Sequence, residues 1–560
     1  MFYRPSYITT AEKNAILKRF WDKDPSLWSI DQEMQQPIKN RLGWLDVLPK
    51  MMEAKAHLTG FAEEIKEMGI TKVVVLGMGG SSLTSIVLKE VFGPEKGYPD
   101  LKILDTTDPD EVERLALENA WDRTLFLVAS KSGTTIEPNA QLNYLWSLLE
   151  SSIPDPGSHF AAITDPGTPL EHLATKKNFL KVFLNPPDVG GRYAALSYFG
   201  LVPAAILGLD LDLIFSKAWD MINKCGPSIP WGQNPACRLS EFLADYSLQN
   251  KDKLTVLADQ KIKPFGLWLE QLIAESTGKE TRGIVPIVGE TTGIPGFYGG
   301  ERAFAYLKLK ETPQEESFDG FLDELKKAQF PVYELSLADI YDIWGQFFLW
   351  EMAVAIASHF LDVNAFNEPD VRSSKEKTKK VLDTYKAQGK MPITFWIDPQ
   401  SQFQFRPSGM LADSMKGLVR AIRDIFQVLP SWGYLAFLPF LPYDKEVDEI
   451  IGEMRHLARQ EHGCATTLGF GPRYLHSTGQ IHKGGPMSAA FLIFTRKRMK
   501  DYPDIPDLGV SFWHLQFAQA LGDFEALSEA NRRVIHVHLP GDYILGLRSF
   551  SKLFSRAVRL

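Results

Sequence analysis

Short hydrophobic runs alternate with helical patterns along most of the chain. The runs are bounded by polar or glycine-rich turns, as expected of buried strands, and helical periodicity separates them, most clearly over residues 82–92 and 135–151. Strands of the first series are expected at residues 72–76, 101–105, 125–129, 159–164 and 181–184. Strands and helices that alternate in this way predict a parallel, doubly wound sheet.

Two more α/β series follow the first. In the second, strands are expected at residues 254–258, 284–288 and 331–335, with helices at 265–277 and 340–361. In the third, strands are expected at residues 434–441, 465–468, 489–494 and 534–538. The fold class predicted is α/β, with a helical segment at 1–68, α/β domains at 69–230 and 231–388, and a C-terminal α/β region at 389–560.

Composition and charge narrow the class of protein. The chain has 560 residues, too many for one core, and its 44% hydrophobic and 23% charged residues are ordinary for a soluble protein. A net charge of −8 argues against a nucleic-acid partner. The most apolar stretch, residues 198–215, is interrupted by Pro203, Asp210 and Asp212, so no membrane partner is expected. Three cysteines without a disulfide or zinc spacing, and an N-terminus unlike a signal peptide, predict a cytoplasmic protein.

Two turns that follow strands carry the most informative chemistry. They read Gly77-Met78-Gly79-Gly80-Ser81-Ser82 and Ser130-Lys131-Ser132-Gly133-Thr134-Thr135. Each turn opens a helix, so N–H groups, hydroxyls and a lysine converge beside a positive helix end, which suits a phosphate. Capping alone needs one hydroxyl, so the excess in the second turn favours phosphate binding. Two such turns in succession predict a phosphosugar pocket at the carboxyl ends of a parallel sheet.

The glycine-rich turn has a second interpretation as a dinucleotide loop. Asp105 would then be the acid that binds a ribose, about 20 residues further along the chain. The full Gly-x-Gly-x-x-Gly spacing fails because Ser82 stands at its last position. The hydroxyl-rich second turn therefore favours a phosphosugar over a dinucleotide.

Further candidate residues have an ordinary structural interpretation beside the functional one. Arg192 follows two glycines and precedes an apolar helix, so it is either a surface arginine or a cation for substrate oxygens. Gln271 and Glu275 share one helix face, and Glu275 lies in the last turn, where the negative helix end raises its proton affinity. From the residues alone, solvated helix positions are the favoured interpretation of Glu275 and Lys375.

Histidines do not predict a metal site. His536 and His538 share one side of a strand, but no third ligand is evident nearby, so no metal is expected. His476 and His482 lie in a polar, glycine-rich loop that suits a lid, a subunit contact or a site.

Several of these segments together resemble a known family. Their order and character are similar to those of glucose-6-phosphate isomerase, over residues 77–82, 130–137, 189–193, 271–279 and 364–375. The C-terminal part, especially residues 471–486, resembles the isomerase portion of bacterial transaldolase/glucose-6-phosphate isomerase fusions. No transaldolase half is visible, so the chain resembles the isomerase portion alone.

The resemblance implies both a fold and an activity. It implies two sugar-isomerase (SIS) type domains, each a three-layer α/β/α sandwich with a parallel sheet, beside the C-terminal α/β region. It also implies a homodimer with its sites near the interface. The implied reaction is the reversible conversion of glucose 6-phosphate to fructose 6-phosphate, in glycolysis and gluconeogenesis, without a metal or organic cofactor.

The family's site residues carry over by position. Glu275 would be the base that moves a proton between C2 and C1 through a cis-enediol intermediate. Arg192 would stabilise that intermediate, and Lys375 would assist ring opening. The implied sugar-binding residues are Gly80, Ser81 and Gln271. The implied phosphate-binding residues are Ser130, Lys131, Ser132, Thr134 and Thr135.

Two positions depart from the family pattern. The family's ring-opening histidine lies in a Gly-Gln-His-Ala-Phe-Tyr segment, and the matching segment here begins at Gly300 and places Arg302 where the histidine stands. Arginine barely releases a proton at neutral pH, so His476 and His482 are reserve candidates for ring opening. Glu368 stands where the family has a substrate-binding glutamine.

Other functions remain open from sequence alone. A sensor with the same fold would bind a sugar phosphate without catalysis and would need no proton-shuttling Glu275. An aldose–ketose isomerase of another phosphosugar, such as mannose 6-phosphate, would use the same residues. A dinucleotide-binding oxidoreductase is the most distant alternative.

Overall fold

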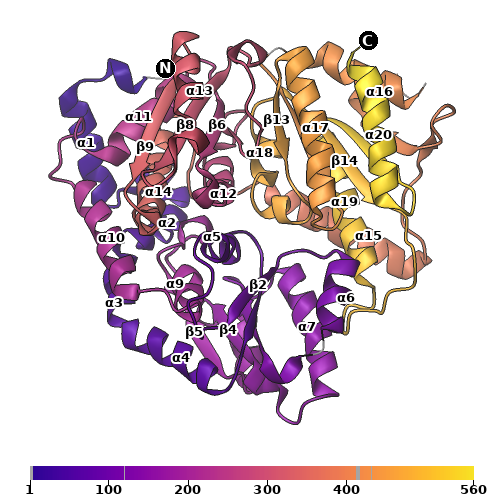
Figure 1. Ribbon diagram of the computed structural model, residues 1–560, viewed down its shortest axis with the longest axis horizontal. Coiled ribbons are helices and arrows are strands. Elements are labelled where there is room, and N and C mark those ends of the chain that lie inside the picture. Colours follow the sequence, from indigo (N-terminus) through magenta and orange to yellow (C-terminus); the bar gives the residue numbers. More distant parts are fainter. Residues whose placement is uncertain (1–3, 119, 412–416, 431, 560) are drawn as a thin grey trace.

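The chain folds around three β-sheets, seen in the computed structural model in Figure 1. The structure describes residues 4–118, 120–411, 417–430 and 432–559, so the expected segments at 1–68 and 389–560 each include residues outside this description. The strands of the three sheets lie within the ranges expected for the two domains and the C-terminal region. The domain borders themselves stay predictions.

The first sheet has five parallel strands in the order β2-β1-β3-β4-β5. Its strands are β1 (Lys72–Gly77), β2 (Asp100–Leu104), β3 (Thr124–Ala129), β4 (Phe160–Thr164) and β5 (Lys181–Leu184). All five were expected from the hydrophobic runs. Because the order reverses between β1 and β3, their carboxyl ends form the crevice in which sheets of this kind bind ligands.

Alternate residues of this sheet belong to different cores. Val73 and Val75 pack into one buried cluster, whereas Val74 and Leu76 pack into another. The first cluster includes α5 (Leu83–Val91) and α9 (Tyr198–Ile206). The second cluster includes α6 (Pro109–Leu117), α7 (Ile136–Glu150) and α8 (Pro169–Lys176). The sheet is therefore the middle layer of a three-layer α/β/α sandwich, as expected.

The second sheet has four parallel strands in the order β7-β6-β8-β9. Its strands are β6 (Lys253–Ala258), β7 (Val285–Ile287), β8 (Arg302–Leu309) and β9 (Val332–Leu337). The central strand β8 was not among the expected strands, although its residues lie in the segment matched to the family's histidine motif. Arg302 at its start and Lys308 near its end interrupt the apolar pattern, so the run between them was not recognised as a strand.

The third sheet is mixed, with the order β10-β11-β15-β14-β12-β13. Its parallel strands are β12 (Tyr434–Pro439), β13 (Ala465–Leu468), β14 (Ala489–Arg496) and β15 (Arg533–Leu539), all expected from the sequence. The short antiparallel strands β10 (Trp396–Ile397) and β11 (Gln404–Pro407) were not expected. The parallel strands have the order second-first-third-fourth, as the strands of the second sheet do.

The remaining helices include the expected helical segment at the N-terminal end. It contains α1 (Thr10–Trp21), α2 (Gln32–Lys39), α3 (Val47–Glu53) and α4 (Lys55–Glu67). The later helices are α10 (Leu211–Lys224), α11 (Pro235–Ser247), α12 (Phe265–Thr277), α13 (Asp319–Lys327), α14 (Ile343–Phe360), α15 (Val371–Gln388), α16 (Leu418–Val428), α17 (Lys445–His462), α18 (Gly479–Gly484), α19 (Phe512–Glu529) and α20 (Tyr543–Val558). None of the described helices is long and apolar enough to cross a membrane.

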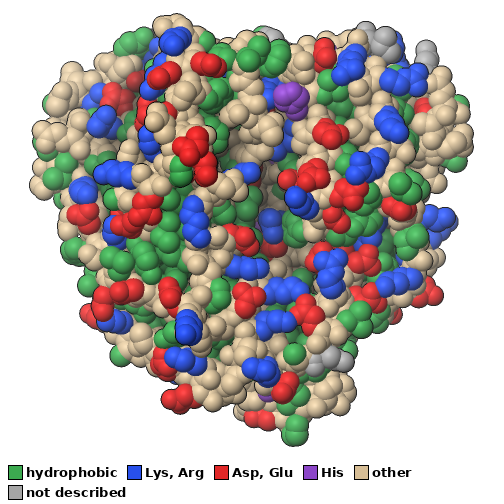
Figure 2. Space-filling view, in the orientation of Figure 1, with side chains coloured by type: hydrophobic (Ala, Val, Ile, Leu, Met, Phe, Trp, Pro, Cys, Tyr) green, Lys and Arg blue, Asp and Glu red, His purple; other side chains and the backbone are tan. Residues whose placement is uncertain are grey.

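The C-terminal region packs tightly onto the rest of the chain. One face of the third sheet shares a buried cluster with α12 and β7 of the second unit. Helix α15 lies along α19, where Ser374 donates a hydrogen bond of 2.9 Å to buried Asp523. A hollow near the middle of one face marks where the three parts meet, and Lys and Arg side chains line it (Figure 2).

A buried ion pair connects the third sheet to the first. Arg496, at the end of β14, reaches Asp108 at 3.1 Å and Asp110 at 2.6 Å, and Asp108 is fully buried. Burial raises the pKa of Asp108 to about 6, and Arg496 opposes that rise. Arg496 therefore stabilises the charge of a carboxylate that has no access to solvent.

Removing the arginine should destabilise the fold. We expect Arg496→Met to lower the free energy of unfolding by about 3 kcal/mol, because it leaves buried Asp108 without its partner. Arg498→Met is the matched control, since Arg498 pairs with a fully exposed Asp501 and should cost less than about 1 kcal/mol. Urea unfolding followed by circular dichroism measures both, and equal losses would contradict this account.

Candidate active site

A cavity of about 360 Å³ opens at the carboxyl ends of β1 and β3. All three parts of the chain contribute to its walls. Its lining residues are Arg41, Met78, Gly79, Gly80, Ser81, Lys131, Ser132, Thr135, Asp165, Gly190, Gly191, Arg192, Tyr193, Gln271, Glu275, Phe366, Glu368, Val371, Lys375 and His476. The cavity therefore brings together most of the residues expected at the site.

The hydroxyl-rich turn forms one wall. Ser132 and Thr134 are exposed and lie 2.9 Å apart through their hydroxyls. Thr135 is the N-cap residue of α7, yet its side chain makes no capping hydrogen bond, so its hydroxyl can still donate to a ligand. Ser130 is buried and donates to Thr135 at 3.3 Å, so it supports the turn. The arrangement suits an anion at the helix N-terminus.

The ammonium group of Lys131 is already bound to other groups of the protein. Its Nζ is paired with Asp165 and donates a 3.0 Å hydrogen bond to the carbonyl of Pro187. The ammonium group still lines the cavity, so it adds positive charge near the turn without pointing freely into it.

The glycine-rich turn allows unusually close contacts between segments. A Cβ atom on Gly80 would lie 2.0 Å from the carbonyl oxygen of Gly191, and one on Gly79 would lie 2.7 Å from that of His476. Gly79 also has a φ of +56°, which side chains rarely adopt. The turn is therefore glycine-rich because the backbone of three segments converges here.

Glu275 and Arg192 form the centre of the site. Oε2 of Glu275 accepts hydrogen bonds from Nη1 of Arg192 at 3.2 Å and from Nε2 of Gln271 at 3.3 Å. The side chain of Glu275 is only 9% exposed, and that of Arg192 is 5% exposed. Burial raises the pKa of Glu275 above its ordinary value, and Arg192 opposes that rise. A carboxylate in such a position can accept a proton near neutral pH.

Glu368 adds a second carboxylate beside Arg192. Its Oε2 lies 3.1 Å from Nη1 of Arg192, and Arg41 donates two hydrogen bonds to its carboxylate, at 2.8 and 3.2 Å. Partial burial disfavours its charge, but Arg192 and Arg41 together lower the pKa of Glu368 to about 2. No pattern in the sequence pointed to Arg41, because it lies outside every recognisable motif.

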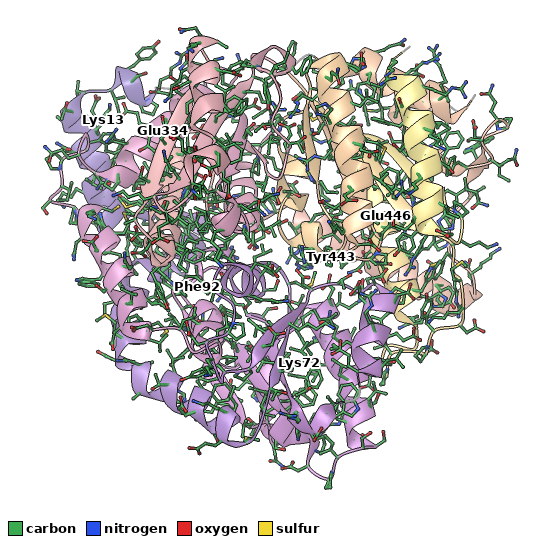
Figure 3. All side chains as sticks on the ribbon, viewed as in Figure 1. Lys13, Lys72, Phe92, Glu334, Tyr443 and Glu446 are labelled. Carbon is green, nitrogen blue, oxygen red and sulfur yellow. The ribbon has the colours of Figure 1, made fainter. Side chains whose placement is uncertain are left out.

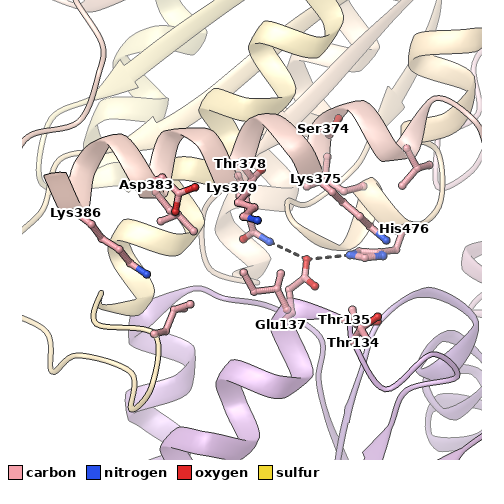
Figure 4. A pocket seen from close by; sticks show the side chains of 16 residues that line it. Thr134, Thr135, Glu137, Ser374, Lys375, Thr378, Lys379, Asp383, Lys386 and His476 are labelled. Carbon is pink, nitrogen blue, oxygen red and sulfur yellow. Dashed lines mark hydrogen bonds and ion pairs between the residues drawn. The ribbon is translucent and has the colours of Figure 1, made fainter. Parts of the chain in front are cut away.

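His476 comes from the C-terminal region and reaches the turn of the first domain. Its Nε2 lies 2.9 Å from Oε1 of Glu137, which also accepts a hydrogen bond of 2.7 Å from Gln519. Lys375 extends from α15 to the side of His476 (Figure 4). Burial opposes ionisation of Glu137, yet His476 and Lys375 hold the pKa of Glu137 below its ordinary value. No role was expected for Glu137 from the sequence.

The other two ring-opening candidates lie elsewhere among the described residues. Arg302 is fully buried in β8, where it donates to Thr255 at 2.7 Å and to both oxygens of Glu290 at 3.0 and 3.1 Å. His482 is buried, with Nδ1 at 3.0 Å from the hydroxyl of Tyr434. Neither residue is in the cavity lining, so His476 is the candidate that the structure brings to the site.

Asp105 is not placed to bind a ribose. It is 1% exposed, and Arg473 occupies both of its carboxylate oxygens, at 2.5 and 2.8 Å. The geometry therefore gives no support to the dinucleotide interpretation of the glycine-rich turn.

Part of the chain is similar in sequence to known isomerases. The family model of phosphoglucose isomerase matches residues 32–301. A glucose-6-phosphate isomerase of Prochlorococcus marinus (strain MIT 9215) is 24% identical over 411 residues, which is 67% of this chain and 77% of that protein. One from Prochlorococcus marinus subsp. pastoris (strain CCMP1986 / NIES-2087 / MED4) is 27% identical over 416 residues, or 68% of this chain and 77% of that protein.

Solved structures show the same fold at lower identity. A hypothetical protein from Thermus thermophilus superposes with a TM-score of 0.57 at 24% identity and covers 66% of this chain and 95% of that one. A glucose-6-phosphate isomerase from Chlamydia trachomatis D/UW-3/Cx gives a TM-score of 0.54 at 17% identity, with 67% and 85% covered. These similarities extend over about two thirds of the chain.

The charge of Glu368 should make the stability of the folded protein fall at low pH. Its pKa of about 2 in the folded protein lies below the ordinary value of 4.5, so its stabilising contribution is present above pH 4.5 and is lost as the pH falls toward 2. We expect Glu368→Gln to destabilise the protein at pH 7 and to differ less from the wild type at pH 4. Urea unfolding at both pH values measures this difference. Glu376→Gln, at an exposed position on α15, is the control; a pH-independent effect of Glu368→Gln would contradict the assignment.

Proposed function

Because residues 32–301 match the phosphoglucose isomerase family, we propose that this chain interconverts glucose 6-phosphate and fructose 6-phosphate. One observation carries the proposal. A buried carboxylate paired with a buried arginine, Glu275 with Arg192, shares a cavity with a hydroxyl-rich turn at a helix N-terminus. A binding protein needs the turn but not the carboxylate, so the pair favours catalysis.

The phosphate binds first in this account. The hydroxyls of Ser132 and Thr135 and the N–H groups at the start of α7 would hold its oxygens, while Lys131 adds charge nearby. Thr134 supports Ser132 through their hydroxyl contact. Fixing the phosphate at this end directs the sugar along the cavity toward Gly80, Ser81 and Gln271.

Ring opening requires a proton to move between the ring oxygen and the anomeric hydroxyl. We assign this step to His476, which Glu137 orients through its 2.9 Å contact, with Lys375 beside it. A carboxylate that holds an imidazole fixes its tautomer and its orientation. Arg302 has no part in this step, because its guanidinium is committed to Glu290.

Isomerisation then needs one base that reaches two neighbouring carbons. Glu275 removes the proton from C2 of the open-chain aldose to give an enediolate, the protonated Glu275 returns a proton to C1, and the hydroxyl proton on the C2 oxygen moves to the C1 oxygen. The N–H groups of Arg192 are bound to protein acceptors, so its positive charge, rather than a hydrogen bond, would stabilise the negative charge that develops on the substrate oxygens. Glu368 and Arg41 keep Arg192 in position and partly balance its charge.

Several finer expectations keep the standing of predictions. They are a homodimer, a cytoplasmic location, and a place in glycolysis and gluconeogenesis. Mannose 6-phosphate differs from glucose 6-phosphate only at C2, and the same base could serve it.

Replacing the base tests the central assignment. We expect Glu275→Gln to lower kcat with fructose 6-phosphate by about a thousandfold or more, because the amide cannot accept the proton. The dissociation constant for the substrate, measured by calorimetry, should change by less than about tenfold, since the phosphate turn is untouched. Glu280→Gln, an exposed position nearby, is the control. Isomerisation at the wild-type rate by the purified Glu275→Gln variant would refute the assignment.

Ring opening can be separated from proton transfer. We expect His476→Asn to lose most of its activity on fructose 6-phosphate but to retain exchange of the C1 proton in 5-deoxyfructose 6-phosphate, which cannot close into a furanose ring. Exchange with deuterated water is followed by nuclear magnetic resonance. Arg302→Lys should keep both activities if it folds. Equal losses of both reactions in His476→Asn would contradict a ring-opening role.

A further inference from the structure

A second cavity, of about 440 Å³, lies where the second and third sheets meet. It is bounded by the ends of β7 and β13, since Val288 and Gly289 follow one strand and Leu468 ends the other. Tyr443, four residues after β12, also lines it and lies near the middle of the view in Figure 3. The carboxyl ends of parallel strands are where α/β sheets bind ligands.

Two polar groups in this cavity lack partners. Glu270 is 8% exposed and makes no hydrogen bond within the described part of the chain; burial raises the pKa of Glu270 to about 8, and the charges of Arg455 and Arg473 oppose that rise. The hydroxyl of Tyr443 is buried and has no hydrogen-bond partner either among the residues that the structure describes. Buried polar groups in proteins are nearly always satisfied, so both point to a polar ligand in the cavity.

Two arginines give the interior of the cavity a positive character. Arg455 is 5% exposed, and its Nε and Nη2 donate to Thr466 and to the carbonyl of Val288, at 3.3 and 3.0 Å. Arg473 uses Nε and Nη2 on Asp105. Among the described residues, neither arginine donates a hydrogen bond through Nη1, and the exposed Lys263 adds a cation at the mouth of the cavity.

The acidic residues of this cavity lie at its mouth. Glu90 and Asp448 are exposed to solvent, where water screens their charge. Glu270 is the carboxyl group inside, and it can accept or donate a hydrogen bond according to its protonation. Ile86, Leu267 and Val288 provide an apolar wall.

We propose that this cavity binds a small hydroxylated oxyanion, either a sugar acid or a phosphate ester. The anionic group lies at the free Nη1 atoms of Arg455 and Arg473, a hydroxyl group satisfies Glu270, and the hydroxyl of Tyr443 donates to the ligand. The site is separate from the proposed catalytic cavity, although α12 supplies Glu275 to one and Glu270 to the other.

Binding by the full chain tests the proposal. Calorimetric titration with gluconate and with glycerol 3-phosphate probes the sugar-acid and phosphate-ester sources separately, and binding of either one supports the site. We expect the double variant Tyr443→Phe, Lys263→Met to weaken that binding at least about tenfold. Lys261→Met is the matched control, because Lys261 is exposed two residues away and does not line the cavity. Unchanged thermal melting shows that the variants fold.

A further variant separates this site from the phosphate turn. Glycerol 3-phosphate can also bind at that turn, so Thr135→Val removes the competing site, and the binding assigned here should persist in it. Gluconate binding that depends on Tyr443 and Lys263 would support this site even if the chain had no isomerase activity. Failure of both probes to bind, or binding that the double variant leaves unchanged, would overturn the proposal.

Discussion

The site depends on the burial of one guanidinium group. Arg192 is 5% exposed, so its charge is stable only if every side of the group meets an acceptor. It donates to Ser276, to Glu275 and Glu368, and to the carbonyls of Ala365 and Asn367. These acceptors come from α12 and from the loop before α15, so the arginine fixes the position of both against the turn after β5.

The same cluster sets the chemistry of the carboxylates. Burial raises the pKa of Glu275, whereas two guanidinium groups lower the pKa of Glu368 to about 2. Two acidic groups on one arginine therefore differ in their affinity for a proton, because only Glu368 also has Arg41. This division leaves Glu275 as the group that can exchange a proton and Glu368 as a permanent countercharge.

Local sequence was enough to predict the first sheet and its turns. Alternating apolar runs, a glycine-rich turn and a hydroxyl-rich turn identified β1, β3 and the loops that follow them. Glu275 and Arg192 needed the family resemblance, because a single carboxylate or arginine on a helix looks like a solvated residue. Their burial depends on packing between units, which no local pattern encodes.

The ring-opening histidine could not be identified from local sequence, for the same reason. A local match put Arg302 in its position, but that segment is a central strand where a buried arginine pairs with Glu290. His476 lies 339 positions from Glu137 in the sequence, and only the docking of the C-terminal region brings them within 2.9 Å. Arg41 was missed because its role depends on the same long-range packing.

The transfer of label from C2 tests most directly whether one carboxylate shuttles the proton. Glucose 6-phosphate deuterated at C2 would be converted briefly, and the fructose 6-phosphate analysed by nuclear magnetic resonance. The account predicts that part of the deuterium appears at C1 and the rest is lost to water, because Glu275 holds the proton on one face while it exchanges. Complete retention of the label, as in a direct hydride shift, would contradict it, and so would a failure to convert the substrate.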